Sequence, residues 1–265
     1  FPQKFLEIAM ELQLPFNPDD LQQLWRRFTS VDKISAFDNL PKEFPSVEEL
    51  TPLWMVLLSQ KRALKATNPD DTYYDDDRIF SDIRNGRMLQ KNLYEIWLFQ
   101  RAYPSTILEI GTRTGLSLAN KLAFHPSPAE CCIVSVDLYI EQGSPEVVEK
   151  NLRQLGIDTA GICYVRGNSL EVLPALTKAL PKIEYDYILV DGSHERDDAR
   201  VDLANSIPLL APDGILVFDD AGPAEDGGGY NLITVWDEVI AEHGQGLDCK
   251  HYDVPYGFCV ARKSS

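Results

Sequence analysis

The chain has 265 residues, enough for one or two domains with a packed core. Hydrophobic residues make up 44% of it and aromatic residues 10%, which is typical of a globular protein and excludes a disordered one. With 25 basic and 41 acidic side chains, the formal net charge is −16. Because such a chain repels phosphate groups, we expect it to bind neither nucleic acid nor an anionic membrane surface.

Three further patterns bear on where the protein works. No uncharged apolar run approaches the roughly 18 residues of a transmembrane helix. The chain starts at Phe1 rather than at a methionine, so we expect it to be a trimmed piece, and it opens with no signal-peptide pattern. The 5 cysteines are odd in number and form no Cys-x-x-Cys motif, which argues against a zinc site or a disulfide framework. We therefore expect a reduced, cytoplasmic location.

The first part of the chain has apolar residues at helical spacing. Ser46 and Glu49, for example, form a capping box in front of the apolar residues Leu53, Trp54 and Leu57. We predict that residues 1–85 form a helical region that supplies lid, substrate or oligomer contacts. Homo-oligomer formation is left open.

From residue 86 onward we predict one α/β domain, residues 86–265, which begins with a helix near Gly86–Tyr103. Short β-branched runs then alternate with helical segments, as in a mostly parallel sheet with both faces covered. The predicted strands are Thr106–Ile110, Cys132–Val136, Ile162–Arg166, Tyr185–Val190 and Ile215–Phe218. The predicted helices are Leu116–Phe124, Pro145–Leu155, Leu170–Leu180, Asp197–Leu210 and Leu232–Glu242. The segments His251–Val254 and Phe258–Arg262 predict an antiparallel hairpin at the sheet edge, which completes a doubly wound sheet of seven strands.

The chemistry is expected where the parallel strands end, because open α/β sheets bind ligands outside the carboxyl ends of their strands. The first strand runs into Gly111-Thr112-Arg113-Thr114-Gly115. Glycine there permits a tight turn and a close approach of the backbone to a ligand. Arg113 interrupts the Gly-x-Gly-x-x-Gly pattern, which weakens a dinucleotide site. An ordinary strand–helix turn stays open as an alternative.

The second and third strands also end in polar residues. Asp137 can accept two hydrogen bonds from a ribose diol, or it can cap a helix. Asn168 and Ser169 can line an adenine pocket, although Ser169 is an equally good helix N-cap.

Three carboxylates follow the fourth and fifth strands, at Asp191, Asp219 and Asp220. If the two strands are neighbours, about 4.8 Å apart, these groups converge and repel one another. A divalent cation with oxygen ligands, such as Mg²⁺ or Mn²⁺, relieves that repulsion. The alternative is that the carboxylates cap helices or pair with arginine.

His194 lies three residues beyond Asp191. A neutral imidazole beside a metal-bound hydroxyl group is suited to act as a general base. A solvent-exposed histidine at the start of a helix is the alternative.

At this point the residues resemble a known family. The segment Ile107–Gly115 resembles motif I of class I S-adenosylmethionine-dependent methyltransferases. The segments Tyr185–His194, Leu209–Gly214 and Phe218–Asp220 are similar to metal-dependent small-molecule O-methyltransferases, within which the macrocin-type and cephalosporin-hydroxylase-like group is the nearest match. The resemblance covers about residues 86–262. It implies a Rossmann-like methyltransferase fold and a cytoplasmic enzyme of natural-product, sugar or polyketide chemistry.

The resemblance also implies a role for each matching residue. The cofactor, S-adenosylmethionine, would be bound by Glu109, Gly111, Thr112, Gly115, Asp137, Asn168, Ser169 and Asp191. The metal, Mg²⁺ or Mn²⁺, would be held by Asp191, Asp219 and Asp220, and Asp191 and His194 would be the catalytic residues. The sugar-modifying relatives tend to have a glutamate in the pair that is Asp219-Asp220 here, which is a departure from their pattern.

The mechanism so implied is a metal-assisted methyl transfer to a hydroxyl group of a small molecule, with His194 removing the proton. Two other classes of protein stay open. One is an NAD-dependent oxidoreductase, against which Arg113 and the three carboxylates argue. The other is a catalytically silent member of the fold that serves as a cofactor-binding or scaffold protein.

Overall fold

The computed structural model describes residues 40, 64, 87–123, 125, 127–140, 143–179, 183–222, 230–254 and 256–264. The helical region predicted for residues 1–85 lies outside these residues, apart from Leu40 and Leu64. None of the helices in the described segments is both long and apolar enough to cross a bilayer.

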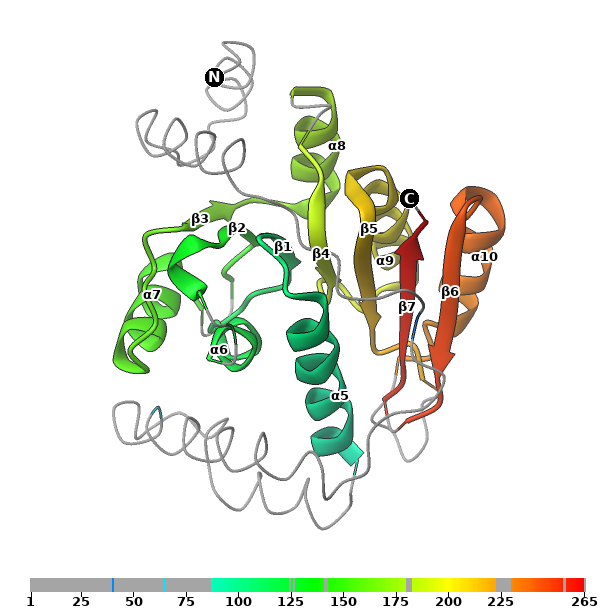
Figure 1. Ribbon diagram of the computed structural model, residues 1–265. Coiled ribbons are helices and arrows are strands. Elements are labelled where there is room, and N and C mark those ends of the chain that lie inside the picture. The colour runs from blue at the N-terminus through cyan, green and yellow to red at the C-terminus, as the bar shows by residue number, and fades with distance from the viewer. Residues whose placement is uncertain are drawn as a thin grey trace.

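Seven strands form a single sheet in the order β3-β2-β1-β4-β5-β7-β6 (Figure 1). Their bounds are β1 Thr106–Ile110, β2 Cys132–Asp137, β3 Ile162–Arg166, β4 Tyr185–Val190, β5 Leu210–Asp219, β6 Leu247–Tyr252 and β7 Phe258–Lys263. Strands β1 to β5 are parallel, whereas β7 runs antiparallel to both β5 and β6. The predicted doubly wound sheet with an antiparallel hairpin at its edge is confirmed.

Helices cover both faces of the sheet (Figure 1). Their bounds are α5 Arg87–Ala102, α6 Leu116–Leu122, α7 Pro145–Gln154, α8 Ser169–Ala179, α9 Arg196–Ser206 and α10 Ile233–His243, with short 3₁₀ turns at Pro128–Glu130 and Ile207–Leu209. Side chains of successive strand residues point to opposite faces. Ile107 of β1 therefore packs in the layer of α5, α6 and α7, and Leu108 in the layer of α8, α9 and α10.

The structure corrects the prediction where the helix before the fifth strand ends. The helix was expected to run to Leu210 and the strand to begin at Ile215, but α9 ends at Ser206 and β5 begins at Leu210. Leu210 pairs with Tyr185, and the register then shifts before Ile215 pairs with Tyr187. The turn-forming residues between them, including Asp213 with a φ of +61°, are accommodated as an irregularity inside the strand.

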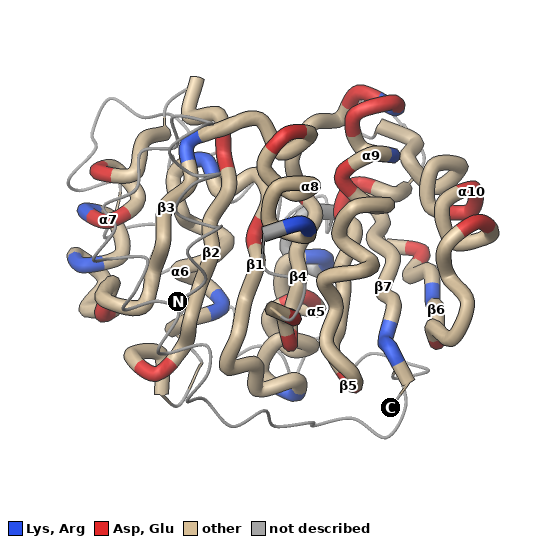
Figure 2. The backbone as a smooth tube through the Cα atoms, turned by 90° about the horizontal axis from the view of Figure 1, so that it is seen from above, with Lys and Arg blue, Asp and Glu red and all other residues tan. Residues whose placement is uncertain are grey.

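Charged side chains on α9 and α10 pair across the outer surface. Arg200 donates two hydrogen bonds to Glu242, at 2.7 and 2.8 Å, and Arg196 pairs with Glu238. Figure 2 shows the two helices side by side, with acidic positions along both. Exposed pairs of this kind contribute little to stability. The apolar layers on the two sides of the sheet supply most of the folding free energy.

Candidate active site

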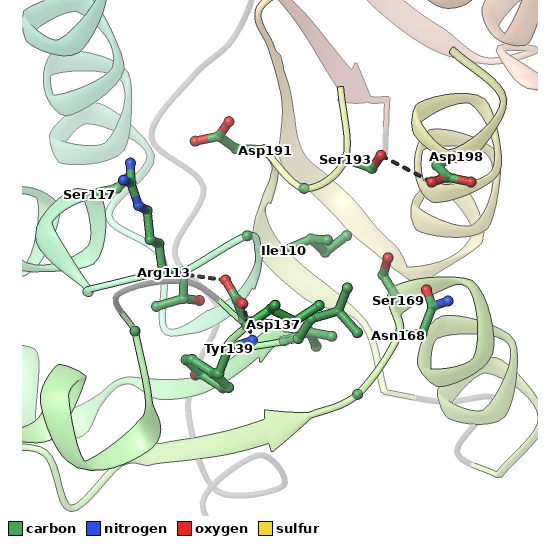
Figure 3. Close-up of a pocket in the computed structure, with 18 of the residues that line it drawn as sticks. Ile110, Arg113, Ser117, Asp137, Tyr139, Asn168, Ser169, Asp191, Ser193 and Asp198 are labelled. Atoms are coloured by element: carbon green, nitrogen blue, oxygen red, sulfur yellow. Dashed lines mark hydrogen bonds between the residues drawn. The ribbon is translucent and has the colours of Figure 1, made fainter. Parts of the chain in front are cut away.

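A pocket of about 550 Å³ opens at the carboxyl ends of the strands (Figure 3). The strand order reverses at β1, which has β2 on one side and β4 on the other. Loops that follow β1, β2, β3 and β4 line the pocket. This is the place where an open α/β sheet binds its ligand.

The loop after β1 makes a turn that only glycine can make. Gly111 has a φ of +90°, and a Cβ added to it would lie 1.7 Å from the carbonyl oxygen of Asp191. The N–H of Asp191 in turn donates to the carbonyl of Ile110 at 2.9 Å. The loops after β1 and β4 therefore meet backbone to backbone at the floor of the pocket.

The carboxylate of Asp137 joins two loops of the pocket (Figure 3). One oxygen accepts the N–H of Arg113 at 2.6 Å and the other accepts the N–H of Tyr139, also at 2.6 Å. The following helix, α7, is capped by Ser144 instead. Asp137 thus holds the turn after β1 against the loop after β2, with its carboxylate at the pocket wall.

Asn168 and Ser169 line the pocket where α8 begins. The Asn168 side chain accepts the N–H of Leu170 at 3.1 Å, so Asn168 takes the capping role that the sequence offered to Ser169.

Six of the eight residues predicted to bind the cofactor line this pocket, namely Gly111, Thr112, Asp137, Asn168, Ser169 and Asp191. Gly115 lies at the start of α6, where a Cβ would come within 2.6 Å of Val148. Glu109 lies on the face of β1 that α6 covers. It is 1% exposed, and its carboxylate lies 3.9 Å from the ammonium of Lys121. Burial raises the pKa of Glu109 to about 7, and Lys121 opposes the rise. The roles of all eight residues in cofactor binding stay predictions.

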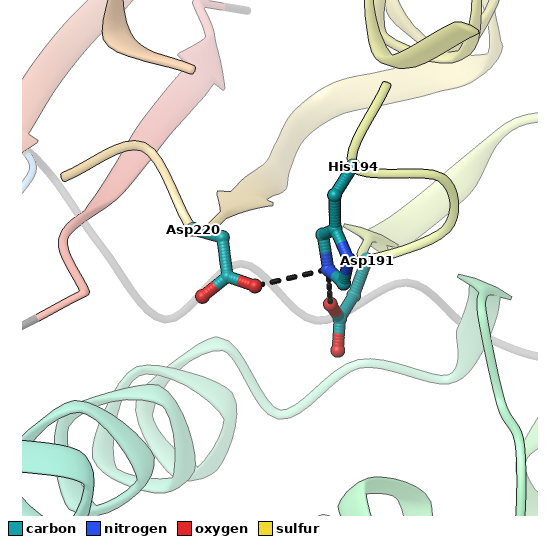
Figure 4. Close-up of side chains that lie close together, drawn as sticks. All are labelled: Asp191, His194 and Asp220. Atoms are coloured by element: carbon teal, nitrogen blue, oxygen red, sulfur yellow. Dashed lines mark ion pairs between the residues drawn. The ribbon is translucent and has the colours of Figure 1, made fainter. Parts of the chain in front are cut away.

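Asp191, His194 and Asp220 converge beside the pocket (Figure 4). Each offers one ligand atom, and these atoms lie within 4.8 Å of one another. Nε2 of His194 lies 3.0 Å from Oδ2 of Asp220 and 3.8 Å from Oδ1 of Asp191. The prediction that the loops after β4 and β5 bring acidic groups together is thus met for Asp191 and Asp220.

The structure does not bring Asp219 into this group. Its carboxylate instead receives the ammonium of Lys91 from α5, with the nitrogen 2.6 Å from one oxygen and 2.7 Å from the other. Lys91 also donates to Asp220 at 3.0 Å. Burial opposes the charge on Lys91, but Asp219 and Asp220 outweigh it and hold the Lys91 pKa well above its usual value. Asp219 as a metal ligand stays a prediction.

Two residues of this region were missed at the sequence level, Lys91 and Tyr230. The ring of Tyr230 stacks on that of His194, with the centroids 3.7 Å apart and the planes at 10°. Nothing in the spacing of Tyr230 indicates this contact. Lys91 did leave a signal, because helical spacing puts it on one face with Glu95 and the buried Leu98.

The electrostatics of His194 follow from its neighbours. Partial burial lowers the pKa of the imidazole, but hydrogen bonds and charges from Asp191 and Asp220 raise it to about 9. The two carboxylates therefore favour a positive charge between them. The two carboxylates form a donor set that fits a divalent cation, and their oxygens suit Mg²⁺ and Mn²⁺.

Comparison with known proteins finds a family model that matches the middle of the chain. Residues 108–221, which run from β1 to the loop after β5, match the family model described as a methyltransferase domain. The matched segment is therefore similar to methyltransferase domains, and the fold and the pocket at the strand ends agree with that likeness.

Solved structures share this fold. An O-methyltransferase from Bacillus cereus in complex with SAH is 14% identical, with a TM-score of 0.56 over 85% of this chain and 93% of that one. The O-methyltransferase TomG from Streptomyces achromogenes, involved in tomaymycin synthesis and solved with SAM, is 19% identical, with a TM-score of 0.51 over 64% and 78% of the two chains. At these identities the likeness concerns the fold.

A relative by sequence is the uncharacterized protein y4gI of Sinorhizobium fredii, which is 28% identical over 181 residues. The match covers 60% of this chain but only 18% of that protein, so the chain spans less than a fifth of the relative's length.

Proposed function

We propose that this protein transfers the methyl group of S-adenosylmethionine to a hydroxyl group of a small molecule, with help from a divalent cation. One observation carries the proposal: the pocket and the acidic group are continuous. Asp191 and His194 line the pocket and also belong to the group completed by Asp220. A methyl donor bound in the pocket would therefore lie next to groups that can acidify a hydroxyl and take its proton.

The pocket offers suitable partners for each part of the cofactor. Each oxygen of the Asp137 carboxylate accepts one backbone N–H and keeps a further lone pair for a ribose hydroxyl. Asn168 and Ser169 lie at the start of α8, where the adenine would be bound. Gly111 and Thr112 line the pocket beside Asp191 and would contact the methionine part.

The acceptor would be bound at the acidic group. Asp191 and Asp220 would hold the cation, Mg²⁺ or Mn²⁺, which lowers the pKa of a bound hydroxyl group when present. Nε2 of His194 would accept the hydroxyl proton, and the stacked Tyr230 ring fixes the plane of the imidazole. The acceptor oxygen then forms a bond to the methyl carbon as the carbon–sulfur bond breaks. The bonding electron pair stays on sulfur, giving S-adenosylhomocysteine.

Several finer points belong to this proposal. Residues 86–265 would form the catalytic domain, and residues 1–85 would contact the acceptor or a second subunit. The cytoplasmic location and a homo-oligomeric state stay predictions.

The test is a methyl-transfer assay with a panel of hydroxylated small molecules and S-adenosylmethionine, read by mass spectrometry. We expect one product that gains the mass of a CH₂ group, together with an equal amount of S-adenosylhomocysteine. Treatment with EDTA should abolish the product, and Mg²⁺ or Mn²⁺ should restore it in the wild type but not in Asp191→Asn. Full activity in EDTA would contradict the role of the cation, and methylation at nitrogen or carbon would contradict the hydroxyl acceptor.

A further inference from the structure

A buried lysine enters the acidic site from a distant part of the sequence. Lys91 lies on α5 and is 4% exposed, and its ammonium nitrogen contacts the carboxylates of Asp219 and Asp220. The residue pairs so joined are 128 and 129 positions apart in the chain. A lysine is almost never buried so completely unless it is paired, so these contacts explain why it is tolerated there.

Lys91 contacts the two neighbouring carboxylates in different ways. Asp219 has both oxygens near the ammonium, and one of them also accepts the N–H of Asp220 at 2.8 Å. Asp220 gives one oxygen to Lys91 at 3.0 Å and turns the other toward His194 at 3.0 Å. Asp219 is thus committed to the lysine, whereas Asp220 faces both the lysine and the group formed with Asp191.

We propose that Lys91 is a built-in cation of the acceptor site, which neutralises Asp219 and restricts any divalent cation to Asp191 and Asp220 beside His194. This inference rests on the proposed function only in taking that group to bind a divalent cation. The charge balance agrees with it. With His194 counted as neutral, as a base must be, three carboxylates and one ammonium leave two negative charges, which one divalent cation neutralises.

Lys91 would then act as a positioning residue. By holding one oxygen of Asp220 it orients the other toward His194 and the acceptor hydroxyl. Without the ammonium, Asp219 would be a buried carboxylate with no cation, and a divalent cation would be drawn to it as a further ligand.

The test is a titration of metal-free protein with Mn²⁺ alone, followed by electron paramagnetic resonance, without cofactor or acceptor. Asp219→Asn should change the Mn²⁺ dissociation constant by less than about threefold, whereas Asp191→Asn and Asp220→Asn should each weaken binding by about tenfold or more. Lys91→Met should tighten Mn²⁺ binding by about tenfold, because Asp219 becomes available as a ligand.

A matched control is Lys121→Met. It removes another buried ammonium of the same layer, one that lies 3.9 Å from Glu95 and from Glu109, and it should leave Mn²⁺ binding unchanged. If Lys91→Met does not fold, the charge-balanced double variant Lys91→Met/Asp219→Asn replaces it and should bind Mn²⁺ like the wild type.

Two results would overturn the role of Lys91. One is a loss of Mn²⁺ binding in Asp219→Asn as large as in Asp191→Asn, and the other is a Lys91→Met variant that binds Mn²⁺ no more tightly than the wild type. Neither depends on methyl transfer, so a failure of the proposed function, seen as no methylated product, is recognised separately. A wild type that binds no Mn²⁺ while Lys91→Met gains a site would support the built-in cation.

Discussion

The two halves of the site are built in different ways. The proposed cofactor half consists of the loops after β1, β2 and β3, and backbone groups shape it: the turn at Gly111 and the two N–H groups bound by Asp137. The proposed acceptor half consists of the loops after β4 and β5, and buried charged side chains shape it, with Lys91 supplied by α5.

The difference matters for how each half responds to change. Backbone contacts in the cofactor half are set by the fold, so a side-chain substitution there should alter binding while the geometry survives. The charges of the acceptor half balance one another in a low dielectric, so the removal of one leaves the others uncompensated. We therefore expect the larger functional losses in the acceptor half.

The largest effect is expected from His194→Ala. The loss of the base should lower kcat by about 10²–10⁴ while the affinity for S-adenosylhomocysteine stays nearly intact. Only the neutral imidazole accepts a proton, and without a cation the neighbouring carboxylates raise the His194 pKa to about 9. A cation on those carboxylates lowers this pKa, so activity of the wild type should rise with pH through a midpoint below 9, and this rise should be absent in the variant.

The matched control is His243→Ala, an exposed histidine at the end of α10 that lies beside Glu242, and it should leave kcat unchanged. A loss of less than about tenfold with the pH dependence retained would mean that the cation alone acidifies the hydroxyl. Loss of Mn²⁺ binding in His194→Ala would make the imidazole a ligand rather than a base.

A smaller effect, on stability, is expected at Asp202, which lies beneath the pocket. Asp202 of α9 is 0% exposed, and its carboxylate lies under Gly192 of the pocket. Burial raises its pKa to about 6. Because the folded state holds this proton more tightly than the unfolded state does, stability falls as the pH rises from about 4 to 6 and stays reduced above that.

At 1.36 kcal/mol per unit of pKa difference, Asp202 costs about 2–3 kcal/mol at neutral and higher pH. Asp202→Asn should therefore be more stable than the wild type by about this amount near pH 8 and equal to it near pH 4, measured by urea unfolding. Asp197→Asn, an exposed position on the same helix, is the control without such a difference. An equal gain in unfolding free energy at both pH values would show that the charge of Asp202 is not the cause.

The smallest effect is expected in the cofactor half. Asp137→Ala should weaken binding of S-adenosylhomocysteine by about 1–3 kcal/mol, the range for the loss of a hydrogen bond to a charged group. Calorimetry on the folded variant measures this directly. Asp158→Ala is a matched control, because that exposed aspartate also accepts a backbone N–H two residues ahead, from Ala160, away from the pocket. Unchanged affinity in Asp137→Ala would show that Asp137 only connects the two loops and does not bind the cofactor.

The same contrast explains what could be predicted from the sequence. The strands follow from short apolar runs, and the bounds predicted for β1, β3 and β4 agree with the structure. The cofactor half follows as well, because Gly111 and Asp137 come directly after strands whose ends must meet at one edge of the sheet. The predicted limits failed near Pro212 and Asp213, where turn-forming residues lie inside β5, and at β6, which was expected at His251–Val254 but runs from Leu247 to Tyr252.

The acceptor half was predicted in part. Asp219 and Asp220 were expected to act together, and both do contact Lys91, but only Asp220 also reaches His194. Asp220 follows the end of β5 with a φ of +54°, a turn that the sequence does not reveal. The pairing with Lys91 could not be predicted either, because α5 lies more than a hundred residues earlier in the chain.

The central claim is that the pocket at the β1 and β4 ends binds S-adenosylmethionine. Titration calorimetry of the wild type with S-adenosylmethionine, S-adenosylhomocysteine and NAD tests it most directly. We expect both sulfur ligands to bind at one site per chain and to compete with each other, and we expect NAD to give no heat. Binding of NAD in competition with S-adenosylhomocysteine, or no binding of either sulfur ligand, would contradict it.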